Sequence, residues 1–141
     1  MKDVLLVEDN QDDELLMLRA FRKNNIANNI VVARDGVEAL DYLFGVGKYA
    51  DKVPPLPEFV LLDLNLPRIS GLEVLKRMRE DSRTRTLPVV VLTSSNEKCD
   101  LVNSYQLGAN SYIRKPVDFD KFVDSVRQLG MYWLTLNQTV N

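Results

Sequence analysis

The apolar residues of the chain fall into short runs of strand length, which alternate with longer stretches of helical period. In the longer stretches, apolar residues recur three and four positions apart, which is typical of helices that bury one face. The short runs predict strands at 3–7, 29–33, 58–62, 88–92 and 110–113. The longer stretches predict helices over 11–25, 35–44, 70–80, 97–107 and 118–136.

A strand followed by a helix, five times over, predicts an α/β fold with a doubly wound, five-stranded parallel sheet. The runs at 4–7, 60–62 and 89–92 are apolar throughout, as strands covered by helices on both faces require. We expect a single domain, 1–141, with its last helix extended to about residue 136 and an elaborated loop at 49–57. Ligands of such sheets bind at the carboxyl ends of the strands.

The composition is that of an ordinary soluble domain, with 45% hydrophobic and 27% charged residues. A formal net charge of -2 argues against a protein that binds nucleic acid through a basic surface. The apolar runs are far shorter than the roughly 18 residues of a membrane span, and the N-terminus does not resemble a secretory signal. We therefore expect a cytoplasmic protein that binds neither nucleic acid nor membrane.

Two features of the composition exclude whole classes of chemistry. Cys99 is the single cysteine, so an internal disulfide and a thiolate metal cage are excluded. The chain has no histidine, which excludes Ser-His-Asp and Cys-His catalysis and histidine-ligated zinc. Any acid, base or nucleophile must therefore be a carboxylate, a hydroxyl, a lysine or this cysteine.

Chemically active side chains follow the predicted strands at the edge where a ligand is expected. Glu8 and Asp9 come directly after the first strand, and Asp63 comes after the third. Thr93 follows the fourth strand, and Lys115 follows the fifth. Each of these residues alone is most simply a solvated surface group, but their common position predicts a shared site.

The charges of this group indicate phosphoryl chemistry. Three clustered carboxylates repel one another, and a hard divalent ion such as Mg²⁺ would neutralise them. With that ion present, Asp63 is the best candidate for a nucleophile that attacks phosphorus, with Lys115 and Thr93 holding the phosphoryl oxygens. Because a turn around Pro67 and Gly71 follows Asp63, we expect its carboxylate to be open to solvent.

The strand-end residues stand in the order and spacing of a known family; they are Glu8–Asp9, Asp63, Thr93, Tyr112 and Lys115–Pro116. In this arrangement the chain resembles a receiver domain of the response regulators of two-component signalling. Further matching segments are 5–10, 63–67 with Gly71, and 107–109. The resemblance covers nearly the whole chain and implies a flavodoxin-like fold with strand order 2-1-3-4-5.

The resemblance also implies a function and a metal site. It implies that Asp63 accepts a phosphoryl group from a histidine kinase and that the protein signals through a change of its protein-binding face. The implied ligands of Mg²⁺ are Glu8, Asp9, Asp63 and the carbonyl of Asn65. Such a protein is not an enzyme, because it catalyses only its own phosphorylation and dephosphorylation.

Three further roles are implied in the same way. Thr93 and Tyr112 would form the switch pair, and Lys115 would contact the phosphate. The loop at 49–57 and the long last helix resemble those of the small single-domain regulators that pair with bacterial phytochromes. The expected partners are therefore a sensor histidine kinase, such as a bacterial phytochrome, and a downstream or relay protein.

Two alternatives compete with this interpretation. A magnesium-dependent hydrolase of the haloacid-dehalogenase type also uses a strand-end aspartate, but it needs a second aspartate two residues later as a general acid. Asn65 stands there and cannot serve as that acid, which favours a persistent phospho-aspartate. A degenerate receiver that only binds partners is disfavoured by the intact carboxylates, Thr93 and Lys115.

Two surface features remain. Apolar residues of the last helix that its core-facing stripe does not absorb predict a homodimer through this helix; they are Val123, Met131, Tyr132 and Leu134. A basic stretch around the third predicted helix is interleaved with acids, which predicts a solvated face; its cations are Arg77, Arg79, Arg83 and Arg85.

Overall fold

The computed structural model describes residues 3–24, 28–93, 108–114 and 119–129. The strands in these ranges are β1 (Val4–Val7), β2 (Ile30–Ala33), β3 (Val60–Asp63), β4 (Val89–Thr93) and β5 (Ser111–Arg114). The helices are α1 (Gln11–Lys23), α2 (Gly36–Phe44), α3 (Gly71–Glu80) and α5 (Phe119–Leu129), with a 3-10 turn, η1 (Gly47–Tyr49). The helix predicted at 97–107 and the end of the last predicted helix lie outside the described residues.

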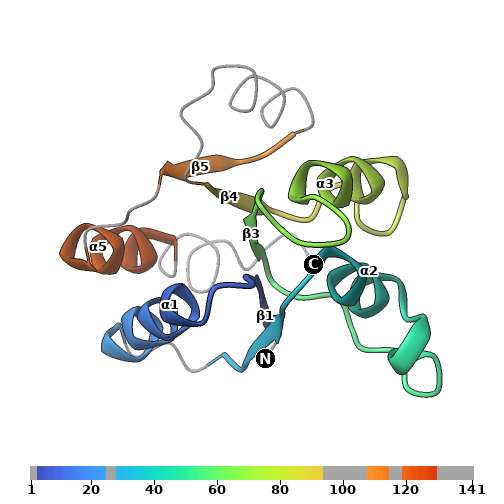
Figure 1. Ribbon diagram of the computed structural model, residues 1–141, viewed down its shortest axis with the longest axis horizontal. Coiled ribbons are helices and arrows are strands. Elements are labelled where there is room, and N and C mark those ends of the chain that lie inside the picture. The colour runs from blue at the N-terminus through green and yellow to red at the C-terminus, as the bar shows by residue number, and fades with distance from the viewer. Residues whose placement is uncertain (1–2, 25–27, 94–107, 115–118, 130–141) are drawn as a thin grey trace.

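The strands form one parallel sheet in the order β2-β1-β3-β4-β5, which confirms the predicted fold class and strand order. Figure 1 shows α1 and α5 on one face of the sheet and α2 and α3 on the other. Val7 is paired with Ala33 on one side and with Leu62 on the other, so β1 ends between its two neighbours. The residues that follow β1, β2 and β3 therefore meet at one edge.

Alternate side chains of the strands fill two separate cores. Leu5 and Val60 lie under α2 and α3, whereas Val4, Leu6 and Leu61 lie under α1 and α5. All of these side chains are fully buried. Burial on both faces is why the strands are apolar runs without alternation, and it fixes the sheet rigidly beneath its carboxyl edge.

The helices next to that edge begin at side-chain caps. The Asn10 side chain accepts a hydrogen bond from the Asp13 N–H at 3.0 Å, and that of Asp35 accepts from the Glu38 N–H at 2.7 Å. Ser70 caps α3 in the same way through the N–H of Glu73, at 3.2 Å. Such caps satisfy amide groups that have no partner within the helix, and they fix where each helix begins.

Arg79 corrects the interpretation of the basic stretch as a solvated face. Its Nη1 donates to the carbonyls of Thr84 and Arg85 at 3.2 and 3.0 Å, and its Nη2 donates to the carbonyl of Gly108 at 2.8 Å. Burial lowers the pKa of this guanidinium from its ordinary value. Arg79 therefore joins the end of α3 to two loops, whereas Arg77, Arg83 and Arg85 are exposed as expected.

We expect Arg79→Met to lower the free energy of unfolding by about 2 kcal/mol, because three carbonyls lose a charged donor. Denaturant titration measures the loss. The control is Arg77→Met, which removes an exposed ion pair with Glu73 on the same helix and is expected to change stability by less than about 0.5 kcal/mol. Equal losses in the two variants would contradict the structural role of Arg79.

Candidate functional site

Three carboxylates meet at the carboxyl edge of the sheet. Glu8 and Asp9 follow β1, and Asp63 is the last residue of the neighbouring β3. One carboxylate oxygen from each residue lies within 4.8 Å of the others. The sequence prediction that these acids share one site is therefore confirmed.

The backbone orients two of these carboxylates. The N–H of Asn65 donates to Asp63 Oδ1 at 2.9 Å, and the N–H of Asn10 donates to Glu8 Oε2 at 3.3 Å. The Glu8 N–H in turn donates to the carbonyl of Ala33 at 2.9 Å, which ties this acid to the end of β2. Backbone donors of this kind offset part of the free energy that burying a carboxylate costs.

Asp63 is less open than the turn after it suggested. The residue is only 3% exposed, and Glu8 is 0% exposed, whereas Asp9 lies in solvent. The chain after Asp63 folds back on the strand, because the N–H of Gly71 donates to the carbonyl of Leu64 at 3.0 Å. The expectation of an open carboxylate is therefore wrong, and of the three acids Asp9 is the exposed one.

The donor set fits a hard divalent cation. Carboxylate oxygens are the ligands such ions prefer, and three of them gather within a few ångströms here. Two of the three acids are almost excluded from water, where a bound cation would attract their carboxylates more strongly than in solvent. The cluster is an acidic metal-binding site.

Of the three remaining predicted site residues, two lie in described strands and one does not. Thr93 ends β4, one position beyond the Leu92 that pairs with Asp63, so its backbone lies at the same edge. Tyr112 lies in β5, is partly buried and packs against the core under α2 and α3. Lys115 lies outside the described residues, directly after the last residue of β5.

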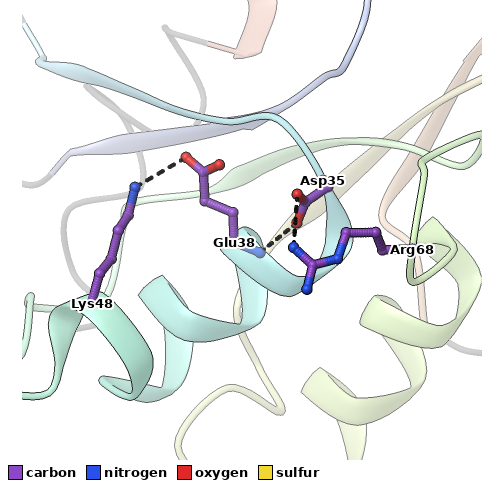
Figure 2. Close-up of polar contacts among 4 residues, drawn as sticks. All are labelled: Asp35, Glu38, Lys48 and Arg68. Atoms are coloured by element: carbon purple, nitrogen blue, oxygen red, sulfur yellow. Dashed lines mark hydrogen bonds and ion pairs between the residues drawn. The ribbon is translucent and has the colours of Figure 1, made fainter.

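Sequence reasoning missed two arginines at this edge. The Nη2 of Arg34 lies 3.1 Å from Glu14 Oε2, and the Nη1 of Arg68 lies 3.7 Å from Asp35 Oδ2. Figure 2 shows the second pair, in which the Asp35 carboxylate also caps α2. A signal was present, because Arg34 directly follows a predicted strand and Arg68 lies in the turn behind Asp63.

No helix in the described part of the chain is long and apolar enough to cross a membrane.

The family described as "Response regulator receiver domain" matches residues 4–127, which include the three clustered acids. The chain belongs to this family. The geometry of the acidic cluster and the order of the strands agree with that assignment.

Individual relatives of this receiver cover nearly all of it. It is 41% identical over 139 residues to the "Probable methanogenesis regulatory protein FilR2" of Methanothrix harundinacea, covering 96% of this chain and 86% of the relative. It is 49% identical to the bacteriophytochrome response regulator AtBRR, covering 94% and 95% of the two chains, with a TM-score of 0.79. The Mn²⁺-bound form of response regulator Rcp1 is 34% identical, with coverage of 100% and 98% and a TM-score of 0.85.

The receiver is a signalling protein of two-component systems rather than a catalytic enzyme. The alternative of a haloacid-dehalogenase hydrolase is therefore wrong. The local structure agrees, because the N–H of Asn65 orients Asp63 and the side chain at this position has no proton to give or take at neutral pH. The metal-bound form of Rcp1 shows that a relative of this receiver holds a divalent ion.

Proposed function

We propose that this receiver accepts a phosphoryl group on Asp63 and works as a stand-alone, cytoplasmic response regulator. The observation that carries the proposal is the position of Asp63, which is buried among two further acids while Asn65 fixes one of its oxygens. Its relatives are of similar length, since the chain spans 86% of FilR2 and 98% of the Rcp1 chain. The donor in this proposal is the phosphohistidine of a sensor histidine kinase, since these 141 residues contain no histidine.

In the transfer, a carboxylate oxygen of Asp63 forms a bond to phosphorus while the bond from phosphorus to the imidazole nitrogen of the donor breaks. The second ring nitrogen of the donor carries a proton, so the electron pair of the broken bond leaves on a neutral imidazole and not on imidazolate. Mg²⁺ would be held by Glu8, Asp9, Asp63 and the Asn65 carbonyl, and would supply positive charge that offsets the carboxylates and the phosphoryl oxygens. Lys115 holds a phosphoryl oxygen from the end of β5.

Thr93 and Tyr112 form the switch in this proposal. Thr93 ends the strand beside the one that ends at Asp63. In the proposal, its hydroxyl donates a charge-assisted hydrogen bond to a phosphoryl oxygen. Tyr112, partly buried against the core, then changes position and alters the face that a downstream or relay protein binds. A change of this kind needs only a few kcal/mol of differential binding.

Two further partners are proposed. The relatives AtBRR and RtBRR are bacteriophytochrome response regulators, which supports a bacterial phytochrome as the sensor histidine kinase of this receiver. Val123, which the sequence analysis left over from the core-facing stripe, is instead buried in the core under α1 and α5. We still propose a homodimer through the final helix, on the remaining apolar residues Met131, Tyr132 and Leu134, which lie outside the described residues. Sedimentation of the phosphorylated and unphosphorylated protein would test this, and a monomer in both states would contradict it.

The metal requirement tests the proposal. We expect acetyl phosphate to phosphorylate the protein with Mg²⁺ present and at least about tenfold more slowly in EDTA, because the clustered acids otherwise repel the donor. Mass spectrometry of the intact protein measures the rate. Phosphorylation at equal rates with and without a divalent ion would contradict the role of the cluster.

A further inference from the structure

Two ion pairs lie on either side of the point where the chain leaves β1. Arg34 and Glu14 join the end of β2 to α1, and Arg68 and Asp35 join the loop after β3 to the start of α2. Because β1 lies between β2 and β3, and α1 and α2 cover opposite faces of the sheet, the two pairs flank the acidic cluster from both faces.

The two pairs present their positive ends to solvent. The side chains of Arg34 and Arg68 are 62% and 64% exposed, whereas those of Glu14 and Asp35 are only 11% and 20% exposed. The carboxylates are thus turned toward the protein and the guanidinium groups away from it. An anion that approaches this edge of the sheet from solvent therefore meets exposed guanidinium groups, whereas their carboxylate partners are largely covered.

Arg68 occupies a backbone conformation that disfavours it. Its φ of 69° lies in the left-handed region, and it is the one non-glycine residue there in the described ranges. This conformation costs an L-residue roughly 1–2 kcal/mol. The exposed ion pair with Asp35, at 3.7 Å, offsets little of this conformational free energy. A gain in stability therefore does not explain why an arginine stands here.

The surrounding contacts hold the loop that carries Arg68, and its partner Asp35, in place. Asp35, its partner, is itself held by the N–H of Glu38 at 2.7 Å, as Figure 2 shows. A Cβ atom added to Gly36 would lie 2.2 Å from the carbonyl oxygen of Ile69, so the loop that carries Arg68 rests directly on the start of α2. A strained residue held in place in this way is typical of functional sites.

We propose that Arg34 and Arg68 form a cationic rim that draws the dianionic phosphoryl donor toward Asp63. The rim rests on the proposed function, because it acts on the donor of that same transfer. Three clustered acids, which one divalent ion would neutralise only in part, and a net charge of -2 oppose the approach of a phosphate dianion. Exposed guanidinium groups beside them counter that repulsion, bind phosphate in bidentate fashion and raise the local donor concentration.

The test is the rate of phosphorylation by acetyl phosphate, at limiting donor, in the double variant Arg34→Gln/Arg68→Gln. We expect a rate about tenfold below wild type at low salt, because charge steering acts over that range. The gap should close as ionic strength rises from about 0.01 M to about 1 M, where screening shortens the reach of exposed charges to about 3 Å.

Three comparisons separate recruitment from damage to the site. Arg77→Gln removes one positive charge from an exposed pair on α3 and should leave the rate at low salt unchanged. Arg68→Lys keeps the charge and should retain most of the rate. Mg²⁺ affinity, measured by titration, should stay equal or rise in the double variant, because a nearby positive charge is lost.

If the double variant is phosphorylated at the wild-type rate at low salt, the proposed role of the cationic rim is wrong, whereas phosphorylation of Asp63 is unaffected. A loss that is equal at all salt concentrations and accompanied by weaker Mg²⁺ binding would overturn the rim too, since damage to the site then explains the result. Wild-type protein that acquires no phosphate on Asp63 would overturn the proposed function itself, and the rim with it.

Discussion

Asp63→Asn is expected to fold normally and to acquire no detectable phosphate from acetyl phosphate with Mg²⁺. The amide has nearly the shape of the carboxylate, and its oxygen can still accept the hydrogen bond from the Asn65 N–H. The variant lacks the anionic oxygen that attacks phosphorus, so the loss of phosphorylation is complete. Circular dichroism checks the fold, and mass spectrometry of the intact protein checks the modification.

Asp12→Asn is the matched control, because it makes the same chemical change at an exposed acid in the first turn of α1. We expect it to be phosphorylated at the wild-type rate. Phosphorylation of Asp63→Asn at a rate close to that of this control would contradict the assignment of Asp63 as the acceptor.

Gly71→Ala is expected to lower the free energy of unfolding by about 3 kcal/mol, the upper part of the range for overpacking. An added Cβ would lie 2.2 Å from the carbonyl oxygen of Asp63 and 2.6 Å from the Cα of Leu64. Both are backbone atoms, so the loop and the end of β3 must move apart. Mg²⁺ affinity should fall as well, because the same movement displaces the Asp63 carboxylate.

The control for this variant is Lys76→Ala, at an exposed position of the same helix. A surface substitution of this kind is expected to change stability by less than about 0.5 kcal/mol. Denaturant titration and Mg²⁺ titration of both variants measure the two effects. If Gly71→Ala is as stable as Lys76→Ala, the close contact between residue 71 and the backbone at the end of β3 does not require glycine.

The periodicity of the sequence predicted the described elements closely because local physics sets them. Strands buried on both faces need unbroken apolar runs, and the side chains of Asp35 and Ser70 begin their helices as N-caps. The predicted helix 11–25 ends at Lys23 in the structure, where the backbone N–H of Asn24 closes the last turn. The strand order followed from the family resemblance and not from the pattern of apolar residues.

The features that sequence reasoning missed depend on contacts between distant segments. Arg79 is half-buried because Gly108, 29 residues later, presents a carbonyl to it. Asp63 is buried, and the chain after it returns to the end of β3 at Gly71; a turn signal alone does not show which way a loop folds. The positive φ of Arg68 was equally hidden, since such a position usually selects glycine or asparagine.

The chemistry of the site was predicted more fully than its geometry. The types of residue at the strand ends indicated a cation and phosphoryl transfer, and the structure brings Glu8, Asp9 and Asp63 together. The two arginines were missed because each pairs with a carboxylate of another element, and such pairs are not visible as a spacing.

Chemical trapping of the phosphorylated wild-type protein tests the central claim most directly. Borohydride reduces an aspartyl phosphate to homoserine, and peptide mass spectrometry then identifies the position that carried the phosphoryl group. The account predicts homoserine at position 63 alone, and only when Mg²⁺ and the donor were both present. Trapping at Asp9 or at any other carboxylate, with Asp63 unmodified, would contradict it.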